Sequence, residues 1–283
     1  MATESCKPLN LDKVLGKARN RISRIGCELE GGWKNLPAGV TLVRDGSVHL
    51  ETYHDPRILA EVDALRQAER HATSSAQLTA LRARRDALER VLIQNTPQIG
   101  ELPSDPMELA KVPVWMKQYY PSIVNDTCGL HIHMSFQSPF HYARLMIPEF
   151  PLTMVEYISR WAAQERLSKD HPIWPRLQGK SEFCQPTFDP VRQKEQTRKA
   201  YDRGAPGHRY TMINYCFGIH GTIECRLLPM MKTAEQGIRA VYRVIEITNA
   251  SLSVQRQREK KLRGEVVMES GDDTVRERRE VRI

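Results

Sequence analysis

The chain has 283 residues, 40% of them hydrophobic, which is enough for one main domain with a sizeable apolar core. We therefore expect a single domain over residues 1–262, followed by a charged tail over 263–283 that is poor in apolar residues. No stretch reaches the ~18 consecutive apolar residues of a membrane span, and the start of the chain has no signal-peptide pattern, so a cytoplasmic protein without a membrane partner is expected.

The placement of charges and cysteines limits the kinds of binding site that the chain can contain. The net charge of +8 comes from residues 1–24, with six Lys or Arg against two acids, and from residues 176–209, with eight against four. Such patches suit a nucleic acid, a phosphate-bearing small molecule or plain solvent. The six cysteines show no CxxC spacing, which predicts reduced core residues and argues against disulfides and a zinc ribbon.

Two helical regions are predicted in the first hundred residues. Residues 8–24 have apolar side chains at roughly helical spacing, which predicts an amphipathic helix that covers the core. These side chains are Leu9, Val14, Leu15 and Ile22. Residues 57–94 form two strongly helical blocks broken at HATSS, where Thr73 to Ser75 supply turn and N-cap chemistry. This pattern predicts a helical hairpin inserted between strands.

The remaining segments outside the predicted strands can be assigned as helix or loop from their proline content, periodicity and length. Prolines crowd together between residues 97 and 121, which predicts irregular structure. Residues 149–171 have the pattern of a helix, and residues 172–208 are expected to form a long, flexible, basic loop of the kind that serves a site. A further long helix is predicted over residues 234–262.

The run IGCELE alternates apolar and acidic residues, as a strand does when its two faces differ. Ile25, Cys27 and Leu29 take one face. Glu28 and Glu30 are left together on the other face, about 6.6 Å apart for a rise of ~3.3 Å per residue.

Three further runs repeat this alternation. In CGLHIHMSF the polar face carries His131, His133 and Ser135, and in GTIECRLL it carries Glu224 and Arg226. A weaker copy, DGSVHLETY, has Val48 and Leu50 opposite His49 and Glu51. Four strands are therefore predicted to share one polar, ionisable face.

One explanation of this face is that it only meets water, as one side of an antiparallel sheet commonly does. The residue choice argues against that, because water-facing strand positions favour Thr, Lys, Ser and Gln. Gathered carboxylates repel one another unless a cation lies among them. Ligation that is rich in carboxylate and free of thiolate favours Mg²⁺ or Mn²⁺ over zinc, and Arg226 could bind phosphate oxygens.

The runs GCELE, CGLHIHMSF and GTIECRLL, in this order, resemble the three catalytic strands of the glutamine synthetase and glutamate–cysteine ligase superfamily. They are most similar to its amidoligase branch of carboxylate–amine ligases. The resemblance covers residues 24–54, 125–137 and 208–231. It implies an α+β fold in which a curved, mostly antiparallel sheet forms a single catalytic core, with helices packed on its outer face and ATP and metals on its polar face.

The resemblance also implies roles for individual residues. The metal ligands it implies are Glu28, Glu30, Glu51, His131 and Glu224. His133 and Ser135 resemble residues that line the nucleotide phosphates, Arg209 resembles an arginine near them, and Arg226 resembles the arginine that holds the transferred phosphoryl group. The pattern departs at Asn214, where glutamine synthetase has a second arginine, which argues against that activity while leaving ligase chemistry intact.

The function implied is that of an ATP-dependent ligase that forms an amide through an acyl-phosphate intermediate, with ATP and Mg²⁺ or Mn²⁺. Arg226, Glu224 and Arg209 are its expected catalytic residues, and alanine variants of Glu224 and Arg226 are expected to lose turnover without unfolding. Its partners would be small-molecule or peptide carboxylates and amines, whose identities the sequence does not specify, and neither does it specify the oligomeric state.

Two alternatives from other classes stay open. In a metal-dependent hydrolase, His131 and His133 would hold zinc as an HxH pair, with a third ligand from elsewhere and no function for Arg226. A basic nucleic-acid-binding protein would use residues 1–24 and 176–209, but the chain lacks a recognition motif and aromatic residues interleaved with basic ones. A nucleic acid is therefore not the expected partner.

Overall fold

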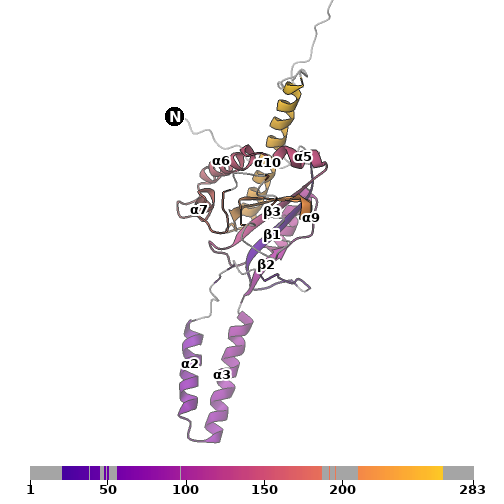
Figure 1. Cartoon of the computed structure of the whole chain (residues 1–283). Coiled ribbons are helices and arrows are strands. Elements are labelled where there is room, and N and C mark those ends of the chain that lie inside the picture. Colours follow the sequence, from indigo (N-terminus) through magenta and orange to yellow (C-terminus); the bar gives the residue numbers. More distant parts are fainter. Residues whose placement is uncertain are drawn as a thin grey trace, which may run out of the picture.

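The computed structural model describes residues 21–37, 39–44, 48, 50, 56–95, 97–186, 191, 195 and 210–263. Within them the chain is α+β, built on one open, five-stranded antiparallel sheet with the strand order β2-β1-β3-β5-β4 (Figure 1). The strands are β1 (Ile22–Trp33), β2 (Gln98–Pro103), β3 (Gly129–Phe136), β4 (Ile213–Cys216) and β5 (Thr222–Pro229).

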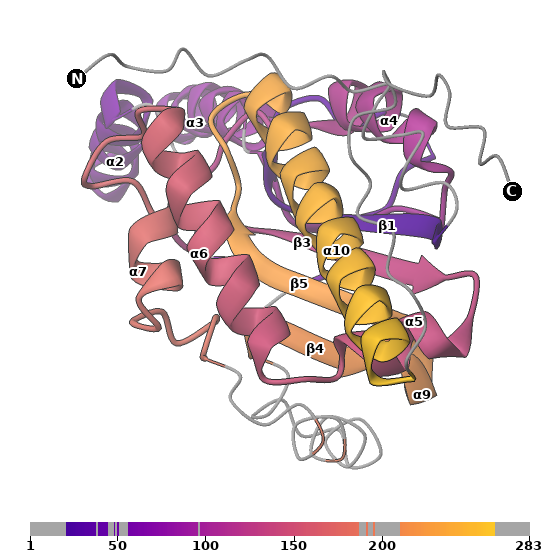
Figure 2. The same cartoon turned by 90° about the horizontal axis from the view of Figure 1, so that it is seen from above.

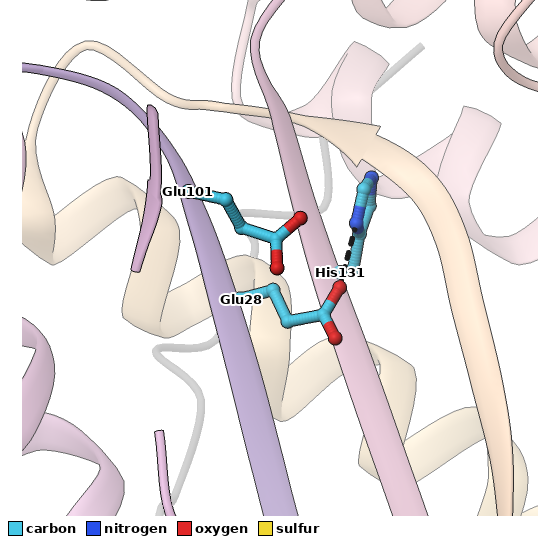
Figure 3. A group of neighbouring side chains, drawn as sticks. All are labelled: Glu28, Glu101 and His131. Carbon is cyan, nitrogen blue, oxygen red and sulfur yellow. Dashed lines mark hydrogen bonds and ion pairs between the residues drawn. The ribbon is translucent and has the colours of Figure 1, made fainter. Parts of the chain in front are cut away.

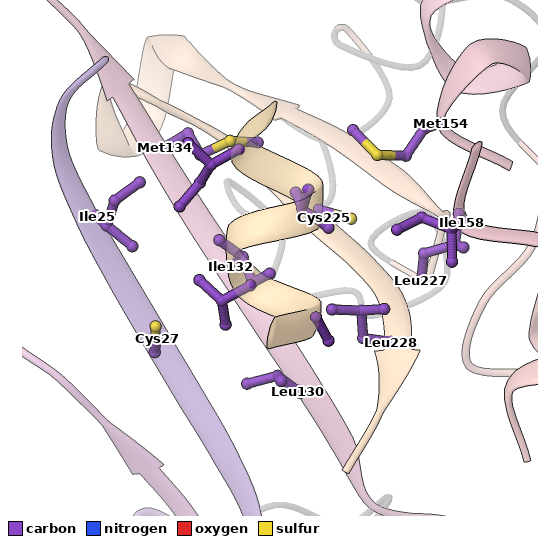
Figure 4. Packing of buried hydrophobic residues seen from close by; sticks show 14 of the residues in the cluster. Ile25, Cys27, Leu130, Ile132, Met134, Met154, Ile158, Cys225, Leu227 and Leu228 are labelled. Atoms are coloured by element: carbon purple, nitrogen blue, oxygen red, sulfur yellow. The ribbon is translucent and has the colours of Figure 1, made fainter. Parts of the chain in front are cut away.

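One face of the sheet carries the hydrophobic core. The alternation in β1, β3 and β5 sends apolar side chains to this face, and Met154 and Ile158 pack nearby from helix α6 (Glu149–Gln164), as Figure 4 shows. Helix α10 (Ala234–Leu262) crosses the same face, with α4 (Val112–Tyr119) and α5 (Pro139–Leu145) beside it (Figure 2). Each fully buried aliphatic side chain contributes about 1.5–3 kcal/mol, so this face holds the sheet in place and leaves the opposite face for polar residues.

The predicted helical hairpin is confirmed. Helices α2 (Pro56–Arg70) and α3 (Ser75–Asn95) lie between β1 and β2 in the chain and project from the end of the sheet (Figure 1). The Oγ atom of Ser74 accepts a hydrogen bond of 3.2 Å from the backbone N–H of Gln77, which caps α3 as the HATSS pattern predicted.

The prediction of irregular structure over residues 97–121 was wrong. This segment contains β2, the 3₁₀ helix η1 (Leu109–Lys111) and α4. Its prolines stand where regular structure tolerates them: Pro97 precedes β2, Pro103 is the last residue of that strand, and Pro113 lies in the first turn of α4.

Three element boundaries also differ from the prediction. Ile22, assigned to a helix over residues 8–24, begins β1, and residues 8–20 lie outside the described part of the chain. The helix expected over 149–171 ends at Gln164, because Arg166 adopts a left-handed φ of 54° just beyond it. The loop expected over 172–208 begins with a short helix, α7 (Ile173–Leu177).

The other segment predictions have mixed outcomes. Helix α10 has the predicted bounds, 234–262. Val48 and Leu50, predicted to lie in a fourth strand, belong to no strand, and β2 takes the place beside β1 instead. Residues 264–283 of the predicted tail lie outside the described residues.

The prediction that the cysteines are reduced core residues is confirmed for five of them, which are free and buried: Cys27, Cys128, Cys184, Cys216 and Cys225.

None of the described helices has the length and apolar composition needed to cross a bilayer.

The close approach of β1 to the segment after α4 gives a test of the fold. Gly31→Ala is expected to lower the free energy of unfolding by about 1–3 kcal/mol, measured by urea denaturation. The reason is that a Cβ atom at Gly31 would lie 2.5 Å from Cβ of Pro121 and 2.9 Å from the carbonyl oxygen of Ile123.

The matched control is Gly218→Ala, in helix α9 (Phe217–His220). Outside the backbone of its own helix, a Cβ atom there meets no heavy atom of the described residues within 4 Å, so the free energy of unfolding should not fall and could rise by up to about 1 kcal/mol because alanine favours a helix. Equal effects of the two substitutions would show that β1 does not pack as the structure has it.

Candidate functional site

The three segments predicted to share a polar face are neighbouring strands. In the register of the sheet, Glu28 on β1 lies opposite His131 on β3, and His133 on β3 lies opposite Glu224 on β5. Asn214 on β4 lies opposite Glu224 from the other side. Pairing of distant segments therefore brings the ionisable residues of β1, β3 and β5 into one cluster.

Glu28 contacts both imidazoles of the HxH run. Its Oε2 atom lies 3.1 Å from Nδ1 of His131, with which it shares a hydrogen bond, and its Oε1 atom lies 2.9 Å from Nε2 of His133. The second contact lacks hydrogen-bond alignment, and Nε2 of His133 is buried without a hydrogen-bond partner among the described residues. Oε1 of Glu224 lies 3.8 Å from His131 Nδ1 and 4.0 Å from His133 Nε2.

Glu30 is buried next to this cluster, with only 2% of its surface exposed. Its Oε2 atom accepts a hydrogen bond from the backbone N–H of Gly129, and its Oε1 atom lies 3.5 Å from Nε2 of His131. A Cβ atom at Gly129 would lie 2.4 Å from that same Nε2 and 2.9 Å from Oε2 of Glu30. A side chain at Gly129 would therefore displace the imidazole of His131 or the carboxylate of Glu30, and glycine leaves both in place.

The carboxylate of Glu224 is held from two sides. Nη1 of Arg226 donates to Glu224 Oε1 at 2.6 Å, and Nδ2 of Asn214 donates to Glu224 Oε2 at 2.8 Å. All three side chains are buried. The guanidinium of Arg226 lies 5.6 Å from the centroid of the Tyr210 ring, and its Nε atom has no hydrogen-bond partner among the described residues.

The sequence analysis missed one acidic member of the cluster, Glu101 on β2. Glu101 lies directly opposite Glu30 in the register, where two like charges repel unless a cation is near. Figure 3 shows its carboxylate beside that of Glu28 and the imidazole of His131. The signal was the alternation in QIGELP, which the surrounding prolines obscured.

Two groups of side chains are placed to hold a cation. Glu28, Glu101 and His131 form one group, and Glu28, His133 and Glu224 form the other; within each, the possible ligand atoms lie within 4.8 Å of one another. Such carboxylate-rich sets suit Mg²⁺ or Mn²⁺. The buried Oε1 of Glu30 and Nε2 of His133, which lack hydrogen-bond partners in the described structure, fit the same interpretation.

A hollow of about 610 Å³ opens over the cluster, and its size is typical of sites for small molecules. Glu28, Glu101, His133, Glu224 and Arg226 line it. Its wall continues along the same face of the sheet to Arg24, Ser135 and Thr222, with Tyr210 and His220 from the segments around β4. The hollow is therefore large enough to hold a substrate in contact with both the carboxylates and Arg226.

The predicted site residues have three outcomes. Glu28, Glu30, His131, His133, Glu224 and Arg226 are clustered. Ser135 lines the hollow farther along β3, where its Oγ lies 3.0 Å from Oγ of Ser23. Glu51 and Arg209, with His49, lie outside the described residues.

Burial and neighbouring charge act against each other on the pKa values of the cluster. Burial raises the pKa of Glu28, but the hydrogen bond with His131, the close contact with His133 and the charges of both imidazoles bring it well below its usual value. For Glu224, burial also raises the pKa, and the charges of Arg226 and His133 overcome this and lower it. Burial lowers the pKa of His133, but the carboxylates of Glu28 and Glu224 raise it above the ordinary value. In the metal-free protein, a proton on His133 is therefore favoured over its ordinary level, and it would compensate part of the negative charge.

Comparison of the chain with protein-family models, curated proteins and solved structures found no match. Function is therefore inferred from the arrangement of these side chains.

The raised pKa of His133 predicts how the stability of the metal-free protein depends on pH. A raised pKa stabilises the fold fully below the unfolded value of about 6.5, and this contribution is lost as pH rises through the folded value. With EDTA present, the free energy of unfolding measured by urea denaturation should fall as pH rises above about 6.5. Burial lowers the pKa values of His141 and His171, so those groups titrate below this window.

His133→Gln should remove most of this slope, whereas His71→Gln on the exposed end of the hairpin should keep it. Mn²⁺ should also weaken or reverse it in the wild type, because metal ligands must be deprotonated. A slope that is the same in the wild type and in His133→Gln would contradict the assignment of the proton to this cluster.

Proposed function

We propose that the protein is an ATP-dependent carboxylate–amine ligase that forms an amide bond through an acyl-phosphate intermediate. The observation that carries the proposal is the clustering of Glu28, His131 and Glu224 on three adjacent strands, with Arg226 against Glu224. This arrangement combines a site suited to a divalent cation with an arginine suited to a phosphoryl group. The antiparallel sheet, with a core face under helices and a polar face under the hollow, supports a catalytic core like that of glutamine synthetase.

Amide formation from a free carboxylate needs an activated leaving group. In the proposed reaction, an oxygen of the substrate carboxylate attacks the γ-phosphorus of ATP and ADP leaves. The amine then attacks the acyl carbon, loses a proton and displaces inorganic phosphate. Catalysis of such a transfer depends mainly on positioning and on stabilising the charge of the phosphoryl group.

The cluster supplies residues for these tasks. Glu28, Glu101, His131, His133 and Glu224 would hold Mg²⁺ or Mn²⁺, and a bound divalent ion would neutralise charge on phosphate oxygens. Arg226 would hold the moving phosphoryl group, with Glu224 fixing the direction of its guanidinium through the 2.6 Å hydrogen bond. Asn214, in place of a second arginine, holds the other oxygen of Glu224.

One observation favours a second candidate, a zinc hydrolase. His131 and His133 both contact Glu28, so the third ligand that an HxH zinc pair needs is present. Metal analysis separates the candidates. Stoichiometric zinc that survives dialysis would favour the hydrolase, and weak Mg²⁺ or Mn²⁺ binding that strengthens with ATP would favour the ligase.

The nucleic-acid alternative gains no support from the described residues. Most of the two basic segments, 1–24 and 176–209, lies outside them, and Arg176 is buried. Tight DNA or RNA binding that falls steeply with salt and is unaffected by Glu28→Gln would be needed to revive it.

The structure changes the choice of test variants. Arg226 and Glu224 form a buried ion pair, and removing one partner from such a pair typically costs about 3–5 kcal/mol of stability. The expectation that alanine variants stay folded therefore has to be dropped in favour of Glu224→Gln and Arg226→Lys, which keep most of the side-chain volume.

ADP release with Mg²⁺, screened over pairs of amino acids and amines, should identify an active pair. With that pair, Glu224→Gln and Arg226→Lys should each lower turnover about a hundredfold, because both weaken stabilisation of the phosphoryl group. The control is Arg239→Lys, which alters a half-exposed ion pair with Glu165 on the helical side of the molecule and should stay near wild-type turnover. Near-normal ADP release by either site variant would refute the phosphate assignment.

A further inference from the structure

Arg176 lies in the short helix α7 and is almost completely buried, with 2% of its surface exposed. Among the described residues its guanidinium donates to three main-chain carbonyls: from Nη1 to Arg226 O at 3.2 Å and Leu228 O at 3.4 Å, and from Nη2 to Cys128 O at 3.3 Å. The charge of Glu30 acts on Arg176, but no described carboxylate lies within ion-pair distance of it. The side chain therefore binds the backbone of β5 and of Cys128, the residue just before β3.

The carbonyls of Arg226 and Leu228 belong to an irregular part of the sheet. Leu130 pairs with Leu228 but Ile132 pairs with Cys225, so β5 has one residue more than β3 between these two pairs. An inserted residue of this kind interrupts the ladder of hydrogen bonds and re-aims nearby side chains. Arg226 lies within this interruption, and Arg176 supplies donors to carbonyls there.

The carbonyl of Cys128 connects Arg176 to the acidic side of the site. The same peptide unit that accepts from Arg176 through Cys128 O donates through the N–H of Gly129 to Glu30. Glu30 in turn lies 3.5 Å from Nε2 of His131. One guanidinium thus holds the backbone that carries Arg226 and the backbone that holds Glu30.

A role in packing alone does not explain an arginine at this position. A buried cation without a carboxylate partner is costly, and an apolar side chain of similar length would fill the space without that cost. The direct hydrogen bonds to three carbonyls in and beside the site account for the choice. Burial lowers the pKa of Arg176, and the charge of Glu30 offsets this only in part.

We propose that Arg176 is a positioning residue that aims Arg226 and Glu30 by fixing the backbone of the β5 irregularity and of the Cys128–Gly129 peptide. Its role rests on the proposed function, in which Arg226 faces the phosphoryl group and Glu30 lies beside the metal ligand His131. Arg176 itself does not line the hollow.

The test uses Mn²⁺ alone as the probe, with binding to the full-length protein measured from the loss of the free-ion signal in electron paramagnetic resonance. Arg176→Met keeps the length of the side chain but removes all donors, and should weaken Mn²⁺ binding at least tenfold. Arg176→Lys keeps the charge with fewer directed donors and should lie between Arg176→Met and the wild type. The matched control, Arg239→Met, removes an ion pair to Glu165 away from the site and should stay within twofold of the wild type.

A folded Arg176→Met variant with wild-type Mn²⁺ affinity would overturn the inference, whatever its thermal stability, because a purely structural role lowers stability without moving the site. If Arg176→Met does not fold, Arg176→Lys replaces it, and an affinity less than threefold weaker than that of the wild type overturns the inference. A wild-type chain that binds no Mn²⁺ would overturn it as well.

ADP release separates this inference from the proposed function. A wild-type protein that binds Mn²⁺ but releases no ADP with any substrate pair would end the ligase proposal, and the positioning role of Arg176 would still be decided by the Mn²⁺ affinities. If turnover is found, Arg176→Lys should lower kcat more than it raises KM for ATP, since it displaces the group that faces the phosphoryl. Equal kcat values would count against the role.

Discussion

The rest of the site depends on one interaction, the contact of the Glu28 carboxylate with the imidazoles of His131 and His133 on either side of it. Glu30 contacts His131, Glu224 lies within 4.0 Å of both imidazoles, and Glu101 lies next to Glu28, so several acids are gathered at the floor of the hollow. Repulsion among them would destabilise the sheet unless positive charge is placed between them. Arg226 and a protonated His133 supply part of that charge, and a divalent ion would supply it more completely.

This balance links stability to function. A proton on His133 and a divalent ion held by Glu28, His133 and Glu224 would exclude each other, because the imidazole nitrogen cannot ligate a metal while it carries the proton. The strands that carry these residues are held from the opposite face by the core under α6 and α10. Arg176 binds the carbonyl of Arg226 within the irregular part of β5 and the carbonyl of Cys128 just before β3, and in the proposed role this contact keeps Arg226 and Glu30 directed at the site.

Much of this arrangement is predictable from local patterns. Period-two alternation identified β1, β3 and β5 and the polar residues they share, and helical periodicity with a capping serine identified the hairpin of α2 and α3. Glu101 was missed because its strand is short and bounded by prolines, so its alternation was not recognised. The role of Arg176 left no pattern in the sequence, because its partners are main-chain carbonyls, which every residue carries. These carbonyls are aligned by the register of the strands, which no local pattern specifies.

Diffraction from crystals containing Mn²⁺ can locate a divalent cation among Glu28, the HxH imidazoles and Glu224. At a wavelength where manganese scatters anomalously, we expect a peak at ligand distance from the carboxylate of Glu28 and from His133 or His131, with Glu224 or Glu101 completing the shell. Peaks confined to exposed acids such as Asp63 or Glu108, with Glu28 still in contact with both imidazoles, would refute a cation site in this cluster.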